Sequence, residues 1–181
     1  MAVLSQMVPL GTPAPDFTLP DLAGQAVRRD DFATAPGLLV AFLCNHCPYV
    51  RHVEAGLGRL LARYPKLAVV GVCANDADAY PDDRPERLAE QVGRAGWTFP
   101  YLVDADQTVA RAYQAACTPD FFLYDAQRRL AYRGAMDQST PGSGKPVTGE
   151  LLDAAITHVL AGDPVPEPHR PSMGCSIKWR V

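Results

Sequence analysis

Residues 38–48 read LLVAFLCNHCP, and this stretch decides which fold the sequence predicts. The apolar residues 38–43 follow a Pro-Gly pair, and a continuous apolar run of this length is typical of a strand that is buried on both faces. Pro48 fits the first turn of a helix, where the missing N–H of proline costs no hydrogen bond. The stretch therefore predicts a buried strand that leads through a Cys-x-x-Cys segment into a helix.

The segments on either side of this stretch alternate between strands and helices. One apolar stripe predicts a helix that ends before Pro65, and it consists of Val50, Val53, Leu57, Leu60 and Leu61. By the same reasoning we expect helices at 85–95, 107–116 and 151–160, and strands at 67–73, 99–103, 121–124 and 129–133. A small hairpin turned at Ala23-Gly24 precedes them. This order indicates an α/β sandwich with helices on both faces of the sheet.

The composition is that of an ordinary globular protein. The chain has 181 residues, 48% hydrophobic and 20% charged, which fits one domain, residues 1–162, and a Pro-rich tail, residues 163–181, that docks on it. A net charge of −3 argues against a general nucleic-acid binder. No apolar run of about 18 residues is present, and residues 1–10 lack the features of a secretory signal. We therefore expect a cytoplasmic protein that binds neither nucleic acid nor a membrane.

Five cysteines, at positions 44, 47, 73, 117 and 175, suggest chemistry rather than a disulfide scaffold, because their number is odd and the chain is long. A thiol at the N-terminus of a helix ionises easily, since this end carries partial positive charge, and the thiolate is the attacking species in disulfide exchange. We expect Cys44 to be the exposed nucleophile and Cys47 to resolve the mixed disulfide. His46, in the spacer, would add positive charge near the Cys44 sulfur.

The Cys-x-x-Cys pair also allows two other interpretations, a structural pair or part of a zinc site with His46. Zinc needs four ligands, usually from two separated clusters, and the sequence has no second Cys-x-x-Cys or His-x-x-x-His. Cys117, Cys175 and His169 are single and scattered. We therefore expect no bound metal, and we expect His169 and the acidic pair Asp82-Asp83 to be solvated.

A second motif, Cys117-Thr118-Pro119, precedes the strand predicted at 121–124. A cis Pro119 would place the Thr118 backbone beside the dithiol, where a substrate strand can pair with it, whereas a trans Pro119 would only open an edge strand. Together with the Cys-x-x-Cys segment, the motif favours the cis form. Cys117 is then a third redox thiol or a buried apolar residue, and Cys175 is an auxiliary thiol or an idle one in a packing tail.

At these motifs the sequence resembles the thioredoxin superfamily, in the branch shared by the AhpC/TSA redoxins (peroxiredoxins) and the TlpA/ResA-like proteins. The matching segments are residues 13–21 (PAPDFTLPD), 44–50 (CNHCPYV), 75–76 (ND), 118–123 (TPDFFL), 142–147 (GSGKPV) and 174–179 (GCSIKW). The resemblance implies a thioredoxin fold, a three-layer α/β/α sandwich with a mixed central sheet, an N-terminal β-hairpin and an insertion around residues 74–100.

The same resemblance implies a function and its partners. It indicates a thiol–disulfide oxidoreductase with an antioxidant role in cell redox homeostasis and without a bound cofactor. The partners would be dithiol or disulfide proteins or low-molecular-weight thiols, and the protein would be a monomer or a homodimer. Its site residues would be Cys44, Cys47 and His46, with Thr118 and Pro119 as the platform for the substrate.

The sequence departs from these relatives at two positions. Peroxiredoxins place Thr three residues before the reactive cysteine. Here Cys44 holds that position relative to Cys47, and an alanine holds it relative to Cys44, which argues against peroxidase activity. Thioredoxins carry a buried acid six residues before the first cysteine, where this chain has Leu38, so Asp76 and Asp104 are the candidate proton acceptors. A thiol peroxidase and a non-catalytic binding module are the alternative functions.

Overall fold

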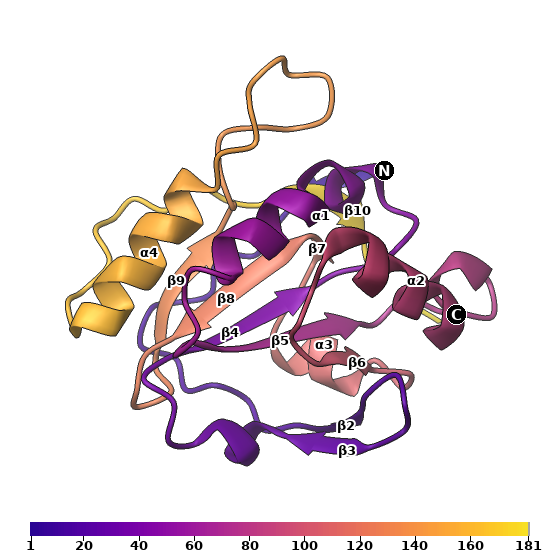
Figure 1. Ribbon diagram of the computed structural model, residues 1–181, viewed down its shortest axis with the longest axis horizontal. Coiled ribbons are helices and arrows are strands. Elements are labelled where there is room, and N and C mark those ends of the chain that lie inside the picture. The colour runs from indigo at the N-terminus through magenta and orange to yellow at the C-terminus, as the bar shows by residue number, and fades with distance from the viewer. Residues whose placement is uncertain (181) are drawn as a thin grey trace.

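A five-stranded mixed sheet forms the centre of the protein, as Figure 1 shows for the computed structural model, which describes residues 1–180. Neighbouring strands of this sheet are β6 (Tyr101–Val103), β5 (Ala68–Cys73), β4 (Leu38–Phe42), β8 (Asp120–Tyr124) and β9 (Leu130–Gly134), in that order. β4 and β5 are parallel, as are β5 and β6, whereas β8 is antiparallel to both β4 and β9. β4 is thus the central strand, with partners on both edges.

Helices cover both faces of this sheet and make the three layers that the sequence predicts (Figure 1). One layer contains α1 (Pro48–Leu61), α2 (Pro85–Ala95) and α4 (Glu150–Ala161). The opposite layer contains α3 (Thr108–Ala112) and the hairpin of β2 (Thr18–Pro20) and β3 (Ala26–Arg28). Two 3-10 turns, η1 (Arg29–Phe32) and η2 (Pro81–Asp83), lie in the connections.

The central strand β4 is buried on both sides, as the apolar run predicts. Leu39 and Ala41 belong to the apolar cluster that includes α1, whereas Val40 and Phe42 belong to the cluster that includes α3. All four side chains are 0% exposed. Successive side chains of a strand point to opposite faces, so a strand covered by helices on both sides has no position for a polar residue.

A second, small sheet was not predicted. It joins β1 (Ala2–Leu4), β10 (Met173–Ser176) and β7 (Cys117–Thr118), all antiparallel, in the order β1-β10-β7. The Pro-rich tail was expected to dock on the domain, but not to contribute a strand. Strands this short leave almost no alternation of polar and apolar residues from which they could be predicted.

The other predicted elements are largely confirmed. The helix predicted at 85–95 has these bounds, and Gly96 ends it at φ +68°, a left-handed conformation that glycine adopts without strain. The hairpin turns at Ala23-Gly24 as expected, and η2 and α2 occupy the predicted insertion. The helix predicted at 107–116 is shorter, because Gln107 and Gln114 have positive φ values of 63° and 56° and stop α3 on either side.

Within residues 1–180, no helix is both long and apolar enough to cross a membrane.

Replacing Leu39 by Ala is expected to lower the free energy of unfolding by about 2–5 kcal/mol, because the change leaves a cavity at the centre of the sheet. Leu4→Ala is the matched control. Leu4 is 55% exposed, so the same change there should alter the free energy of unfolding by less than about 0.5 kcal/mol. Urea unfolding followed by circular dichroism measures both values, and equal losses in the two variants would contradict the central position of β4.

Candidate functional site: a cluster of thiols

Cys47, and not Cys44, lies at the mouth of a helix. α1 begins at Pro48, and Cys47 is its N-cap residue, with an extended backbone (φ −75°, ψ 124°). The free N–H groups and the partial positive charge at this end of α1 therefore act most directly on the Cys47 sulfur. The expectation that Cys44 occupies this position is wrong, because residues 45–47 separate it from the first residue of the helix.

Cys44 lies just beyond the end of β4, opposite Thr118. β4 and β8 are antiparallel, and Phe42 pairs with Asp120. The residues two positions beyond this pair, Cys44 and Thr118, therefore face each other, and Cys44 Sγ lies 3.1 Å from Thr118 Oγ1. Cys47 reaches the same residue from α1, since its Sγ, as a thiol, donates to the Thr118 carbonyl oxygen at 3.2 Å. Thr118 thus contacts both sulfur atoms.

The thiols of Cys44 and Cys47 have pKa values that are shifted in opposite directions. A hydrogen bond from the Cys44 thiol lowers the pKa of Cys47 well below the usual thiol value and outweighs the opposing effect of burial. The Cys175 thiol and the backbone N–H of Val50 also lower the pKa of Cys47. Burial raises the pKa of Cys44 far above its usual value, and the hydrogen bond to Cys47 raises it further. These directions favour ionisation of Cys47 before Cys44.

Neither of these two sulfur atoms is at the surface, because Cys44 and Cys47 are both 0% exposed. The prediction that Cys44 is exposed is therefore wrong. Cys44 follows a central strand and is covered by α2, from which Gln91 Nε2 donates to the Cys44 carbonyl oxygen at 3.0 Å. A thiol in such a place loses the hydration that would stabilise its charged form.

The peptide bond between Thr118 and Pro119 is cis, as the sequence predicts. The 3.2 Å contact of Cys47 Sγ with the Thr118 carbonyl oxygen also confirms that the Thr118 backbone lies beside the dithiol. β10 pairs with this edge, so its use by a substrate strand stays a prediction that requires β10 to move away.

His46 does not place a free positive charge beside Cys44. Its Nδ1 lies 2.6 Å from Asp83 Oδ2, and its ring stacks on Tyr80 with the ring centroids 5.1 Å apart. A proton on the imidazole is thus balanced by a carboxylate in direct contact. The effect of His46 on the ionisation of Cys44 stays a prediction.

Asp83 is the buried acid of the site, and the sequence interpretation missed it. Asp83 is 1% exposed, and it accepts hydrogen bonds from the backbone N–H of Asn45 (2.7 Å) and from Asn75 Nδ2 (2.8 Å). Burial alone raises the pKa of Asp83, but hydrogen bonds from His46, Asn75 and Asn45 outweigh it and hold the pKa below its ordinary value. The expectation of a solvated Asp83 is wrong because η2 turns this side chain inward, which Pro-Asp-Asp as a local sequence does not reveal.

The two acids that the sequence offered as proton acceptors serve other purposes. Asp104 accepts the backbone N–H of Ala110 at 2.7 Å and so stabilises the start of α3. Asp76 lies 3.4 Å from Arg180 Nε in the C-terminal segment. Among the hydrogen bonds of residues 1–180, neither carboxylate reaches a thiol.

Cys44, His46 and Asp83 bring three potential metal ligands together, with the ligand atoms within 4.8 Å of one another. Zinc would need a fourth ligand. The Asp83 carboxylate already accepts hydrogen bonds from four N–H groups, and Cys44 Sγ is engaged with Thr118, so a metal ion would have to displace these partners. The donor set therefore fits a hydrogen-bond network better than a metal centre.

Cys175 is the third thiol of this site. β10 pairs with β7 so that Cys175 lies directly opposite Thr118. Residues directly opposite each other in an antiparallel pair project their side chains to the same face, so the Cys175 thiol lies on the face where Thr118 meets Cys44. Burial raises the pKa of Cys175, and its hydrogen bond to Cys47 raises it further. We call Cys44, Cys47 and Cys175 the thiol cluster.

Cys117 and Cys73 lie outside the thiol cluster. Cys117 pairs with Ser176, so its side chain projects to the face of the small sheet opposite to that of Thr118. It is 0% exposed, and burial raises its pKa. Cys73, the last residue of β5, is 3% exposed, and burial raises its pKa as well. The core position expected for Cys73 is confirmed, and for Cys117 the geometry favours a buried apolar residue over a redox thiol.

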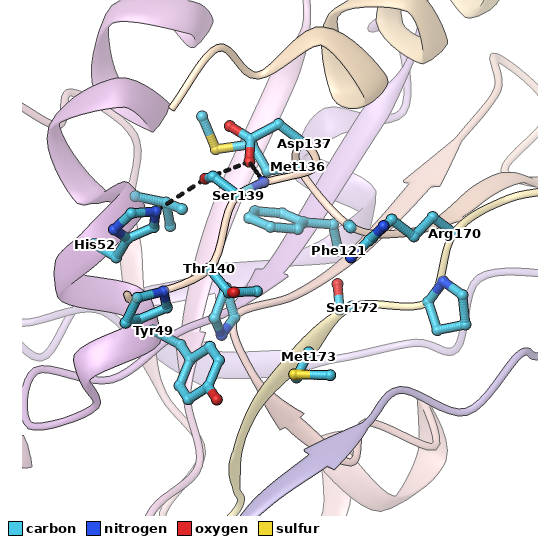
Figure 2. Close-up of a pocket in the computed structure, with 15 residues that line it drawn as sticks. Tyr49, His52, Phe121, Met136, Asp137, Ser139, Thr140, Arg170, Ser172 and Met173 are labelled. Carbon is cyan, nitrogen blue, oxygen red and sulfur yellow. Dashed lines mark hydrogen bonds between the residues drawn. The ribbon is translucent and has the colours of Figure 1, made fainter. Parts of the chain in front are cut away.

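A small pocket opens between α1, Pro119 and the segments 135–141 and 170–173 (Figure 2). On one side His52 Nε2 lies 2.9 Å from Ser139 Oγ, which ties the 135–141 segment to α1. The open volume of about 30 Å³ admits a molecule the size of water. Pro119, which follows Thr118, lines this pocket, whereas none of the three cysteines of the thiol cluster does.

The sequence matches the AhpC/TSA family over residues 10–133. It is 31% identical over 123 residues to the thiol-disulfide oxidoreductase ResA of Geobacillus thermodenitrificans (strain NG80-2), and this alignment covers 68% of the present chain and 67% of that protein.

Solved structures share the architecture. The crystal structure of a hypothetical protein from Sinorhizobium meliloti 1021 superposes with a TM-score of 0.96 at 48% identity and covers 98% of each chain. The thioredoxin domain of a thiol-disulfide oxidoreductase from Bacteroides vulgatus superposes with a TM-score of 0.60 at 19% identity, covering 80% of this chain and 96% of that one. The fold is therefore the thioredoxin fold, and the chain belongs to the AhpC/TSA family.

Proposed function

We propose that the protein is a thiol–disulfide oxidoreductase in which Cys47 is the attacking thiolate and Cys44 is the resolving thiol. The observation that carries this proposal is the position of Cys47 at the N-terminus of α1 with a lowered pKa, next to a protonated Cys44. These roles are the reverse of those first inferred from the sequence.

The reaction follows from the protonation states of the pair. The Cys47 thiolate attacks one sulfur of a substrate disulfide, forms a mixed disulfide and expels the other half of the substrate as a thiolate. Cys44 then loses its proton to the departing group and attacks the Cys47 sulfur, which gives a Cys44–Cys47 disulfide and releases the second half of the substrate as a thiol. Two electrons pass from the protein to the substrate, and an external thiol or dithiol returns them.

Asp83 has a positioning role in this scheme. Its carboxylate hydrogen-bonds the backbone N–H groups of Asn45 and His46 and so fixes the spacer between the two cysteines. Its negative charge also raises the pKa of Cys44, after the larger effects of burial and the hydrogen bond to Cys47. Asp83 therefore helps to keep the proton on Cys44 and the negative charge on Cys47.

The partners proposed for this reaction are disulfide-bearing proteins and low-molecular-weight thiols, and the ResA relative is named as an enzyme of thiol–disulfide chemistry. We further propose a cytoplasmic location, in which a thiol donor would keep the cluster reduced.

A thiol peroxidase is the second candidate, and one observation favours it. Cys47 is 0% exposed, so a small oxidant would reach its sulfur more easily than a protein does. Peroxide would oxidise the Cys47 thiolate to a sulfenic acid with loss of hydroxide, and attack by Cys44 would release water and form the disulfide. Peroxide consumption in the presence of dithiothreitol, faster for the wild type than for Cys47→Ser, would support this candidate.

Cys47→Ser is expected to abolish the fast reaction with a small disulfide, whereas Cys44→Ser should retain the first attack. At pH 6 an ordinary thiol is almost fully protonated, so loss of the Cys47 thiolate should slow the first step by on the order of tenfold or more. The measurement is the rate of release of one equivalent of 4-thiopyridone from 4,4′-dithiodipyridine. Cys73→Ala is the control, since this buried cysteine lies outside the cluster. A fast phase that survives in Cys47→Ser and disappears in Cys44→Ser would overturn the assignment.

Asp83→Asn is expected to shift the ionisation of Cys44 to lower pH, because the nearby negative charge is lost. Alkylation by iodoacetamide, followed for each cysteine by mass spectrometry across a pH series, measures this shift. An unchanged profile for Cys44 would show that Asp83 acts only on the shape of the 45–46 segment.

Asp83 should also make stability depend on pH. The pKa of Asp83 is lowered in the folded protein, so its contribution is present above about pH 4 and is lost as the pH falls through the lowered pKa. At pH 7 the Asn variant should be less stable by about 1–3 kcal/mol, and its free energy of unfolding should fall less steeply than that of the wild type below pH 4. Urea unfolding at pH 7 and pH 3 measures both effects. If the free energy of unfolding of the variant and of the wild type fell by the same amount between these pH values, the prediction would be contradicted.

A further inference from the structure

We propose that Cys175 is a third redox thiol, which forms a disulfide with Cys47 and connects the buried pair to thiols in solution. The proposal rests on the proposed function in one respect, namely that Cys47 is the attacking thiol.

The first argument is the position of β10 on the sheet edge at Thr118. Cys175 pairs with Thr118 and projects its side chain to the face that carries the other two thiols. This is the edge at which an incoming substrate strand would pair, so β10 occupies it as a strand of the protein's own chain. Cys175 thereby holds the place of a substrate cysteine opposite the Cys47 thiolate.

The second argument is that a glycine precedes Cys175 at the point where β10 comes closest to the Thr118 backbone. A Cβ atom on Gly174 would lie 2.0 Å from the Thr118 carbonyl oxygen and 3.1 Å from the Pro119 nitrogen. Both of these neighbours are backbone atoms and have little freedom to move, so only glycine allows β10 to lie so near the dithiol. Gly174 directly precedes Cys175, and its lack of a side chain brings the thiol to the site.

The third argument is that the tail is anchored on both sides of β10. Before the strand, Ser172 Oγ donates to the Gly134 carbonyl oxygen at 2.6 Å, and the Ser172 N–H donates to Ser5 Oγ at 2.9 Å. After it, the Lys178 N–H donates to Asn75 Oδ1 at 2.8 Å. Figure 1 shows β10 beside the start of α1 as a result. The Cys175 thiol is therefore presented to Cys47 by a fixed segment.

The fourth argument is access. Cys44 and Cys47 are 0% exposed, whereas Cys175 is half-buried and is the part of the thiol cluster that meets solvent. A donor thiol therefore meets Cys175 before it meets either residue of a Cys44–Cys47 disulfide. It would approach a Cys47–Cys175 disulfide from the side of Cys175, the residue of the cluster that has exposed surface.

The chemistry balances with a dithiol as the reductant. Once Cys44 has resolved the captured substrate, the Cys175 sulfur attacks Cys47 in the Cys44–Cys47 disulfide and passes its proton to the departing Cys44 thiolate, which forms the Cys47–Cys175 disulfide; without Cys44, Cys175 attacks the mixed disulfide on Cys47 in the same way. A dithiol donor then attacks the Cys175 sulfur and expels the Cys47 thiolate, a good leaving group because its pKa is low. The second thiol of the donor closes the donor disulfide, and Cys175 departs and takes up a proton.

The test is the fate of the captured substrate when Cys44 is absent. The Cys44→Ser variant is mixed with oxidised glutathione, free thiols are blocked with N-ethylmaleimide in acid, and the linked peptides are mapped by mass spectrometry. We expect a Cys47–Cys175 disulfide within each chain and the release of two glutathione molecules per oxidised glutathione. The matched control, Cys44→Ser with Cys175→Ser, should stop at Cys47 linked to one glutathione.

The outcomes separate this proposal from the proposed function. If Cys44→Ser alone also stops at the Cys47–glutathione disulfide, or links Cys47 to Cys117, Cys175 is not the third redox thiol although Cys47 still attacks. If Cys47 remains unmodified in both variants, the proposed function fails as well.

A second variant guards against a change in folding at the replaced cysteines. Gly174→Ala should push β10 away from Thr118 and reduce the yield of the Cys47–Cys175 disulfide, while Cys47 still reacts with oxidised glutathione. An undiminished yield of the Cys47–Cys175 disulfide in Gly174→Ala would contradict the role of β10.

Discussion

The contact of Thr118 with two sulfur atoms is the constraint on which the rest of the site depends. Cys44 Sγ lies 3.1 Å from the Thr118 hydroxyl oxygen, and Cys47 Sγ lies 3.2 Å from the Thr118 carbonyl oxygen. The first contact follows from the antiparallel register of β4 and β8, and the second from the start of α1 at Pro48. A change of this register by one residue would turn the Thr118 side chain to the other face of the sheet and remove its contact with Cys44 Sγ.

Local sequence patterns were sufficient to predict most of the fold. The buried strand at 38–43, the helix at 85–95 with its terminating Gly96 and the N-terminal hairpin each depend on neighbouring residues, and each is confirmed. The cis bond before Pro119 was also predicted, although only in combination with a distant Cys-x-x-Cys segment. Such local patterns of residues are typical of these elements, so a single sequence is enough to predict the elements.

The chemistry within the site was less accessible from the sequence, because it depends on contacts between distant segments. The order of the two cysteines in the chain suggested that Cys44 attacks, but the helix begins after Cys47, and the burial of Cys44 depends on α2. Asp83 was expected to be one half of a solvated acidic pair, but η2 directs its carboxylate inward, where it accepts a hydrogen bond from the backbone N–H of Asn45. The pairing of Cys175 with Thr118 could not be predicted from the sequence either. The need for glycine at position 174 becomes clear only from its close approach to the Thr118 carbonyl group.

Within the thiol cluster, charge and access are assigned to different residues. Cys47, whose pKa is lowered, has no exposed surface, whereas Cys175, whose pKa is raised, is half-buried. A solvated thiolate would react with any oxidant that diffuses to it, whereas a buried one reacts only with species that enter the site. In the proposed disulfide of these two residues a donor would approach from the Cys175 side, and Cys47 would be the better leaving group because its pKa is lowered. The burial of Cys47 together with the partial exposure of Cys175 would thus both protect the Cys47 sulfur from solvent and favour its reduction by a dithiol donor.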